Sequence, residues 1–287
     1  MPSALRPRRA GLVVRSGPHS EVTLGSPAPQ PVKRTPMDAS KRRRGIYLLP
    51  NLLTTGCLFF GFFAIISAFN GDFRNAALAI FIAMVFDGLD GRVARMTNTQ
   101  SDFGVQFDSI ADMVSFGVGP ALVAWIWALS GTASLPGPLA KLGLLIAFVY
   151  AACAALRLAR FNTQVGMADK RYFQGLPSPA AAGVVAGLIW VGDHLGISDG
   201  SAMIASGVIV LTAGLLMVSR LRYYSFKEVD FRYRVPFFTM VVVLLALAFL
   251  LIHPPTVLFA GFFIYMLSGP ALTWHQRRRR VREGRSG

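Results

Sequence analysis

The chain has 287 residues, of which 53% are hydrophobic and only 15% are charged, and its formal net charge is +15. Soluble domains carry roughly a quarter charged residues, so this composition excludes an ordinary soluble protein and indicates one that lies in a membrane. The basic residues are divided among the segments that join apolar runs, without a recognisable nucleic-acid-binding fold. Anionic lipid headgroups, rather than nucleic acid, are therefore the expected partners of this charge.

The N-terminal segment 1–40 differs from the rest of the chain. It is rich in Pro, Arg, Ser and Gly and contains no apolar stretch typical of a secretory signal, so we expect it to be disordered. Met37 stands just before the basic block 41–44 and is a candidate start of translation, which N-terminal mass spectrometry of the native protein would test. We expect a membrane-embedded domain at 41–273 and a basic cytoplasmic tail at 274–287.

Eight apolar runs follow the basic block, and most are close to the roughly 20 residues that an α-helix needs to cross ~30 Å of hydrocarbon. They cover 52–69, 75–95, 104–129, 139–160, 179–194, 202–219, 235–252 and 256–273. The fifth is the shortest. The sequence therefore predicts an all-α integral membrane protein with about eight transmembrane helices.

The connections between these runs alternate in charge. Basic residues lie at 41–44, after the second, fourth and sixth runs, and at 277–280, whereas the intervening connections hold little positive charge apart from Arg74 and Lys141. Because Lys and Arg beside membrane segments favour the cytoplasmic side, we expect both termini to be cytoplasmic. The membrane would be the inner, cytoplasmic membrane of the cell.

Two aspartates, Asp87 and Asp90, close the second apolar run, where ionisable groups are costly and point to function. On a helix, Asp87, Asp90, Gly91 and Ala94 share one face. The two small residues leave room there for a bulky ligand to approach the backbone. This spacing predicts a pair of carboxylates beside an open surface.

A second acidic face begins after an interval of eight residues, with Gly104, Asp108 and Asp112 spaced four apart. If the connection 96–103 forms a helical hairpin, the two faces converge near the cytoplasmic side. Four crowded carboxylates require protonation or a cation, and all-oxygen ligands suit Mg²⁺ or Mn²⁺. Two other interpretations are possible: the aspartates could form helix–helix hydrogen bonds, with Asp102 beside Ser101 as a helix cap, or they could be the carboxylates of an ion transporter.

The complete pattern D87xxD90G91xxA94R95, eight residues, then G104xxxD108xxxD112 resembles the signature of the CDP-alcohol phosphotransferase family. The resemblance implies an integral membrane enzyme that displaces CMP from a CDP-linked donor with an alcohol. It implies that Asp87, Asp90 and Asp108 bind divalent metals, with Asp112 completing the acidic site. Asp112 would take the acceptor's proton, which a hydroxyl nucleophile must lose. The resemblance places the nucleotide beside Gly91, Ala94, Arg95 and Gly104.

Further stretches resemble the bacterial branch of this family that uses serine. They are 42–54 (RRRGIYLLPNLLT), 101–117, 156–162 (LRLARFN), 173–179 (FQGLPSP) and 224–230 (YSFKEVD). This branch implies CDP-diacylglycerol as donor, L-serine as acceptor, Mn²⁺ or Mg²⁺ as cofactor and a homodimer. The signature alone leaves another acceptor open, such as glycerol 3-phosphate or inositol phosphate.

Residues outside the signature have two readings each. The resemblance places Asn51 and Thr54 near the nucleotide, although Pro50 followed by these residues also fits a helix N-terminus. Arg157 and Arg160 offer guanidinium groups that suit a carboxylate or a diphosphate, although they also fit basic anchors at the end of a span. Cys57 and Cys153 lie in apolar runs and are expected to be core residues.

Overall fold

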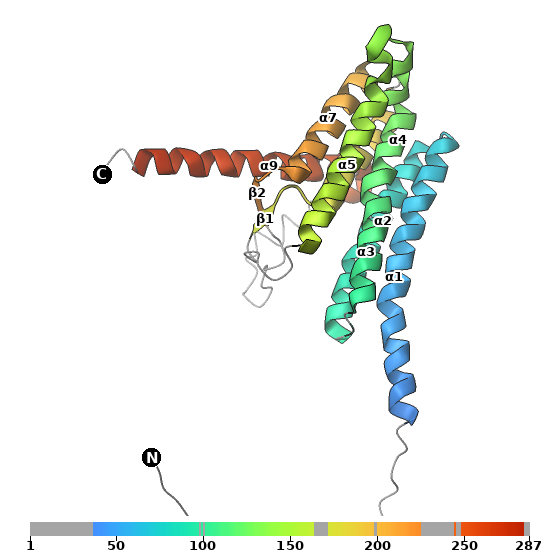
Figure 1. The fold of residues 1–287 in the computed structure, drawn as a ribbon. Helices are drawn as coiled ribbons and strands as arrows, with labels where there is room; N and C mark the ends of the chain where they lie inside the picture. The colour runs from blue at the N-terminus through green and yellow to red at the C-terminus, as the bar shows by residue number, and fades with distance from the viewer. Residues whose placement is uncertain are drawn as a thin grey trace, which may run out of the picture.

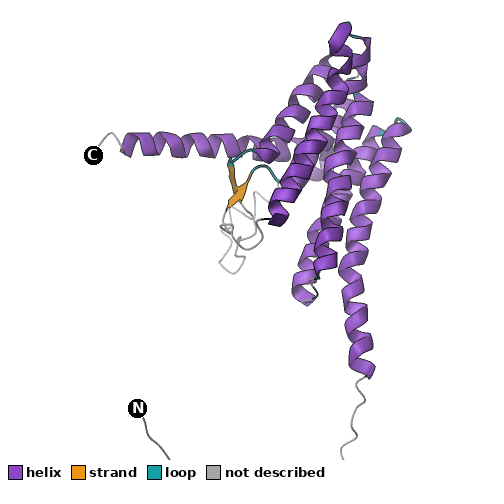
Figure 2. Cartoon of the chain, in the orientation of Figure 1, coloured by secondary structure: helices purple, strands orange, loops and turns teal. Residues whose placement is uncertain are grey.

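The computed structural model describes residues 37–97, 99, 101–163, 172–197, 200–224, 244 and 248–283. These residues form helices and one short two-stranded ribbon (Figures 1 and 2). The elements are α1 Met37–Phe69, α2 Phe73–Thr97, α3 Asp102–Asp112, the π-helix η1 Met113–Val118, α4 Gly119–Trp127, the 3₁₀ turns η2 Leu129–Ser134 and η3 Gly137–Lys141, α5 Leu142–Thr163, β1 Tyr172–Gln174, α6 Ser178–His194, α7 Gly200–Val218, β2 Arg222–Tyr224 and α9 Pro254–Glu283.

The all-α membrane class is confirmed, whereas the count of eight spans is not. Within the described residues, five helical stretches are long and apolar enough to cross a membrane: 48–69, 102–127, 137–163, 200–218 and 254–274. Helix α2 has sufficient length but carries charged residues that include Asp87 and Asp90, and α6 has only 17 residues. Most of the seventh predicted span, 235–252, lies outside the described residues.

Helix α1 begins earlier than the sequence predicts. It starts at Met37, and Pro50 lies inside it rather than at its first turn. The interpretation of Pro50 and Asn51 as a helix N-terminus is therefore wrong. A proline ring removes one backbone donor and crowds the preceding turn, and here the hydroxyl oxygen of Thr54 lies 3.1 Å from the Pro50 carbonyl oxygen.

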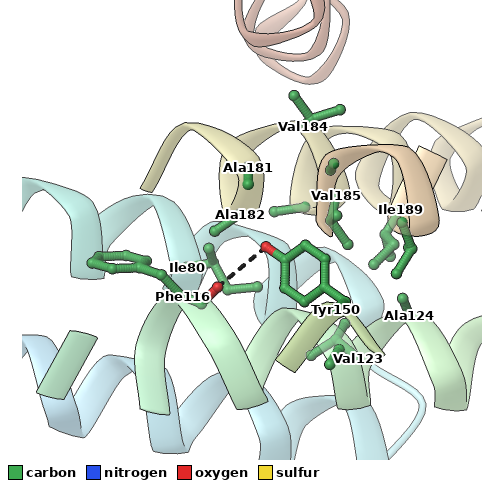
Figure 3. Packing of buried hydrophobic residues seen from close by; sticks show 14 of the residues in the cluster. Ile80, Phe116, Val123, Ala124, Tyr150, Ala181, Ala182, Val184, Val185 and Ile189 are labelled. Atoms are coloured by element: carbon green, nitrogen blue, oxygen red, sulfur yellow. Dashed lines mark hydrogen bonds between the residues drawn. The ribbon is translucent and has the colours of Figure 1, made fainter. Parts of the chain in front are cut away.

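The third predicted span is divided by a π segment. Ser101 caps α3 by accepting a hydrogen bond from the Gly104 amide at 3.0 Å, and the chain then passes through η1 into α4. The buried Tyr150 hydroxyl donates to the Phe116 carbonyl of η1 at 3.1 Å (Figure 3). Helix α1 packs closely on η1 at Gly61. A Cβ atom added at Gly61 would lie 2.7 Å from the Cα of Ser115, so this position has no room for a larger side chain.

Helix α6 contributes many residues to the core, and Figure 3 shows its Ala182, Val185 and Ile189 on the side of Tyr150. Small residues let helices approach closely in membranes. A Cβ at Gly187 would lie 2.8 Å from the Cα of Phe259, and one at Gly183 would meet the Phe262 ring at 2.8 Å. Helix α9 packs on this surface and runs across the bundle rather than along it (Figure 1).

The ribbon connects the start of α6 to the end of α7. Strands β1 and β2 are antiparallel, and the Gly175 amide donates to the Leu221 carbonyl at 2.9 Å. Gly175 has a φ of +81°, a conformation that favours glycine. The buried Tyr223 hydroxyl donates to the Met266 carbonyl of α9 at 3.0 Å. Burial raises the pKa of Tyr223.

Candidate active site

Three of the four signature aspartates come together between α2 and α3. Asp87 and Asp90 lie on the last turns of α2, and Asp108 lies on α3. Each offers one carboxylate oxygen, and these oxygens all lie within 4.8 Å of one another. The hairpin that the sequence predicts forms through the connection between Thr97 and Asp102, so the two acidic faces do converge.

Asp90 is the most deeply placed of the three, with 4% of its surface exposed. Its Oδ2 atom accepts a hydrogen bond of 2.7 Å from the hydroxyl of Thr54 on α1. Thr54 is itself buried, at 4% exposed. A third helix thus holds a carboxylate of the cluster, a contact that the spacing of the aspartates did not reveal.

Asp112 lies one helical turn beyond Asp108 and beside the cluster of three. Its Oδ1 atom is buried and makes no hydrogen bond to the described part of the chain. Its carboxyl group lies within electrostatic range of Asp87, Asp108 and Arg157. A buried polar atom without a partner costs roughly 1–3 kcal/mol, so this oxygen is available to a ligand, a cation or a proton donor.

The surface beside the cluster is open, as the small residues predict. A Cβ at Gly91 would have the Arg95 Nη1 atom at 4.0 Å as its nearest neighbour, and one at Gly88 would meet nothing within 4 Å. Across the site, a Cβ at Gly104 would lie 3.5 Å from Oδ1 of Asn51. The structure therefore brings Asn51 to Gly104 and Thr54 to Asp90, while farther along α2 Ala94 is partly exposed and Arg95 is exposed.

The two arginines of α5 are tied to residues that follow them in the chain. Arg157 Nη1 donates to the Ser178 hydroxyl at 2.7 Å, and Arg160 Nη2 donates to Oε1 of Gln174. Arg157 lies within electrostatic range of Asp112 and Asp87. It therefore adjoins the acidic site, whereas the sequence offered only a general choice between ligand binding and membrane anchoring.

Other polar residues near the site have structural partners. The Asn162 amide donates to the Ser109 hydroxyl at 3.0 Å, which links α5 to α3. Cys57 and Cys153 are buried with free thiols, as predicted for core residues. Gln174 and Ser178 accept hydrogen bonds from the two arginines, and in the sequence only their place in the stretch 173–179 indicates them.

The donor set fits a hard divalent cation. It consists of three carboxylates with converging oxygens, and a fourth carboxylate with a buried, unpartnered oxygen lies beside them in the described chain. Oxygen-only ligands are those that Mg²⁺ and Mn²⁺ prefer. These residues indicate a site for a divalent cation and do not distinguish Mg²⁺ from Mn²⁺.

Comparison with known proteins places this arrangement in a family. Residues 47–218 match the sequence profile described as CDP-alcohol phosphatidyltransferase. The chain belongs to the CDP-alcohol phosphatidyltransferase family. The matched region begins before the Thr54 contact to Asp90 and ends with α7, so it contains all four aspartates and both arginines of the site.

Relatives within the CDP-alcohol phosphatidyltransferase family carry a more specific name. A Helicobacter pylori protein named CDP-diacylglycerol–serine O-phosphatidyltransferase is 34% identical over 224 residues, which are 78% of this chain and 90% of the relative. A Bacillus subtilis protein of the same name is 35% identical over 182 residues, 63% of this chain and 92% of the relative. One from Methanocaldococcus jannaschii is 37% identical over 159 residues, 55% of this chain and 68% of the relative.

Proposed function

We propose that this chain is a CDP-diacylglycerol–serine O-phosphatidyltransferase. It transfers the phosphatidyl group from CDP-diacylglycerol to L-serine and releases CMP. The observation that carries this proposal is the cluster of Asp87, Asp90 and Asp108 beside the buried Asp112, in a chain whose relatives bear that name. The apolar helices around the cluster suit a donor whose acyl chains remain in lipid.

The residues have separate tasks in this reaction. Asn51, Thr54, Gly91, Ala94, Arg95 and Gly104 form the nucleotide side of the site. Asp112 takes the proton of the serine hydroxyl, whose oxygen forms a bond to the phosphorus of the phosphatidyl group. The bond from that phosphorus to the CMP oxygen breaks, and CMP leaves. A hydroxyl is a weak nucleophile near neutral pH, so a carboxylate base placed beside it contributes typically 10²–10⁴-fold.

Asp87, Asp90 and Asp108 would hold Mn²⁺ or Mg²⁺, with Asp112 at the edge of the set. When bound, the metal supplies positive charge that neutralises the diphosphate and the leaving group. The chain prepares this site by burying Asp90 and fixing its Oδ2 atom with Thr54. Arg157 and Arg160 add positive charge at the acceptor or diphosphate.

The deciding experiment measures CMP release by the purified protein with CDP-diacylglycerol and Mn²⁺ or Mg²⁺, with and without L-serine. We expect release that requires both serine and metal. Glycerol 3-phosphate and inositol phosphate serve as competing acceptors. Release that depends on one of these and not on serine would keep the family and reject the serine assignment.

The orientation and assembly are part of the same proposal. The site lies at the end of the bundle that carries Arg92, Arg95 and Arg160, and basic residues favour the cytoplasmic side. We therefore assign the site and both termini to the cytoplasmic face of the inner membrane, with the chain as a homodimer. Protease accessibility in inside-out vesicles and light scattering of the detergent-solubilised protein test these two statements.

A further inference from the structure

A hydrogen bond between side chains joins α3 to α5 beside the acidic site. The Nδ2 atom of Asn162 donates to the Ser109 hydroxyl at 3.0 Å. The Ser109 hydroxyl donates its own proton to the Val105 carbonyl of α3, also at 3.0 Å. A hydroxyl has one proton and two lone pairs, so Ser109 can accept from Asn162 while it donates to Val105. The bond therefore has a defined direction and ties the end of α5 to the middle of α3.

This bond lies close to the place where the two helices face each other across the site. On α3, Ser109 follows Asp108 directly and precedes Asp112 by about one turn. On α5, Asn162 lies between one and two turns after Arg157. Asp112 and Arg157 are within electrostatic range of each other. The helices thus run in opposite directions, and the Ser109–Asn162 bond is the next contact along them.

Asp112 and Arg157 each present a vacant atom in this region. The Oδ1 atom of Asp112 and the Nε atom of Arg157 are buried, and neither has a hydrogen-bond partner in the described parts of the chain. A carboxylate and a guanidinium in direct contact form a strong charge-assisted pair, which would occupy both atoms. The separation between α3 and α5 is therefore a property of the site, because it leaves Oδ1 of Asp112 open.

Few other contacts fix this separation. Helix α3 packs mainly on α1, whereas α5 packs on η1 and α4, and the backbones of α3 and α5 seldom approach each other closely. The carboxylates of the metal cluster belong to α2 and α3, which both pack on α1. Loss of the Ser109–Asn162 bond would therefore let α3 shift relative to α5 while the metal cluster stays together.

We propose that Asn162 is a positioning residue for the transfer reaction, which acts through Ser109 to hold α3 at the separation from α5 that keeps Asp112 in place for the acceptor hydroxyl. Neither Asn162 nor Ser109 has to touch a substrate. A misplacement of reacting groups by about 1 Å can cost roughly 100-fold in rate. The inference rests on the proposed serine transfer and goes beyond it by giving a role to a pair of residues outside the acidic signature.

The test measures kcat at saturating L-serine and CDP-diacylglycerol, together with the Kd for Mn²⁺. Asn162→Ala should lower kcat roughly 10- to 100-fold, with the Kd for Mn²⁺ and the KM for CDP-diacylglycerol within about threefold of the wild type. Ser109→Ala should cause the same loss, whereas Ser109→Thr, which retains the hydroxyl, should keep most of kcat. The double variant Ser109→Ala with Asn162→Ala should lose no more than either single variant, because both changes remove the same bond.

Thr163→Val is the matched control. Thr163 is the neighbour of Asn162 and is exposed, and its hydroxyl donates at 2.9 Å to the Arg160 carbonyl of its own helix. The substitution removes a hydrogen bond at the end of α5 and leaves the link to α3 intact, so we expect an unchanged kcat. The melting temperature in detergent checks that each variant is folded. If Asn162→Ala does not fold, the comparison of Ser109→Ala with Ser109→Thr decides.

Three results would overturn the inference while leaving serine transfer intact. The first is an unchanged kcat in Asn162→Ala and Ser109→Ala. The second is a rise in the Kd for Mn²⁺ as large as the fall in kcat, which would assign the pair to the metal site. The third is a double variant whose loss equals the product of the single losses, since the two residues would then act separately. Failure of the proposed function is distinct, because the wild-type protein itself would then release no CMP in response to serine.

Discussion

Removal of the Thr54 hydroxyl should weaken metal binding although Thr54 is not a metal ligand. Thr54 donates to Oδ2 of Asp90 at 2.7 Å, and both side chains are buried. A hydrogen bond to a charged group contributes about 1.5–3 kcal/mol, and each 1.4 kcal/mol is tenfold in an equilibrium constant. Thr54→Val, which keeps the shape, should therefore raise the Kd for Mn²⁺ by roughly 10- to 100-fold, in the range typical of residues that support metal ligands.

The assay is a Mn²⁺ titration of the purified protein in detergent, followed by electron paramagnetic resonance of the free ion. Thr55→Val is the matched control, because the neighbouring Thr55 donates only to the Asn51 carbonyl, at 2.7 Å, and is exposed. If the Kd of Thr54→Val for Mn²⁺ lies within about threefold of that of the control, the idea that Thr54 supports the metal ligand Asp90 is refuted. An unchanged Kd with a raised KM for CDP-diacylglycerol would place the hydroxyl on the nucleotide instead.

Three further substitutions test other contacts. Asp112→Asn should lower CMP release by at least 100-fold, as expected for loss of a general base, while an equal loss of Mn²⁺ affinity would show that Asp112 is mainly a metal ligand. Gly61→Ala should lower the melting temperature in detergent, because its Cβ would lie 2.7 Å from the Ser115 Cα; Gly261→Ala, with open space around it, should not, and equal melting temperatures would contradict the close packing. Tyr150→Phe should cost about 1 kcal/mol through the lost bond to the Phe116 carbonyl, and an unchanged unfolding midpoint would show that this bond contributes nothing.

The acidic cluster could be predicted because the residues that form it lie close together in the sequence. Asp87 and Asp90 lie one turn apart on a single helix, and Asp108 follows after a connection too short for any arrangement but a hairpin. Helical periodicity and chain length are enough to bring such residues together. The partner of Asp90 was not predictable in this way, because Thr54 is 36 residues away and its approach depends on how α1 packs on α2.

Other features have no strong signature in the sequence. Strands β1 and β2 have three residues each, which is too short for alternating hydrophobicity to be recognised. Pro50 suggested a helix start, but α1 continues through it. The path of α9 across α6 depends on the contacts of Gly183 and Gly187 with Phe262 and Phe259. Hydropathy predicts that a segment is apolar, but the direction in which it runs is decided by its neighbours.

The π segment at Met113–Val118 joins α3 to α4, so the number of residues in it sets how the side chains of the two helices are oriented relative to each other. Each residue of an α-helix turns the chain by about 100°, and a wider π turn changes the angular phase between the parts that it joins. Asp108 and Asp112 on one side can thus point at α2 while the buried Val123 and Ala124 on the other side point at the core. Deletion of a single residue here would put the two parts out of phase, so that either the carboxylates or the core residues would face the wrong neighbour.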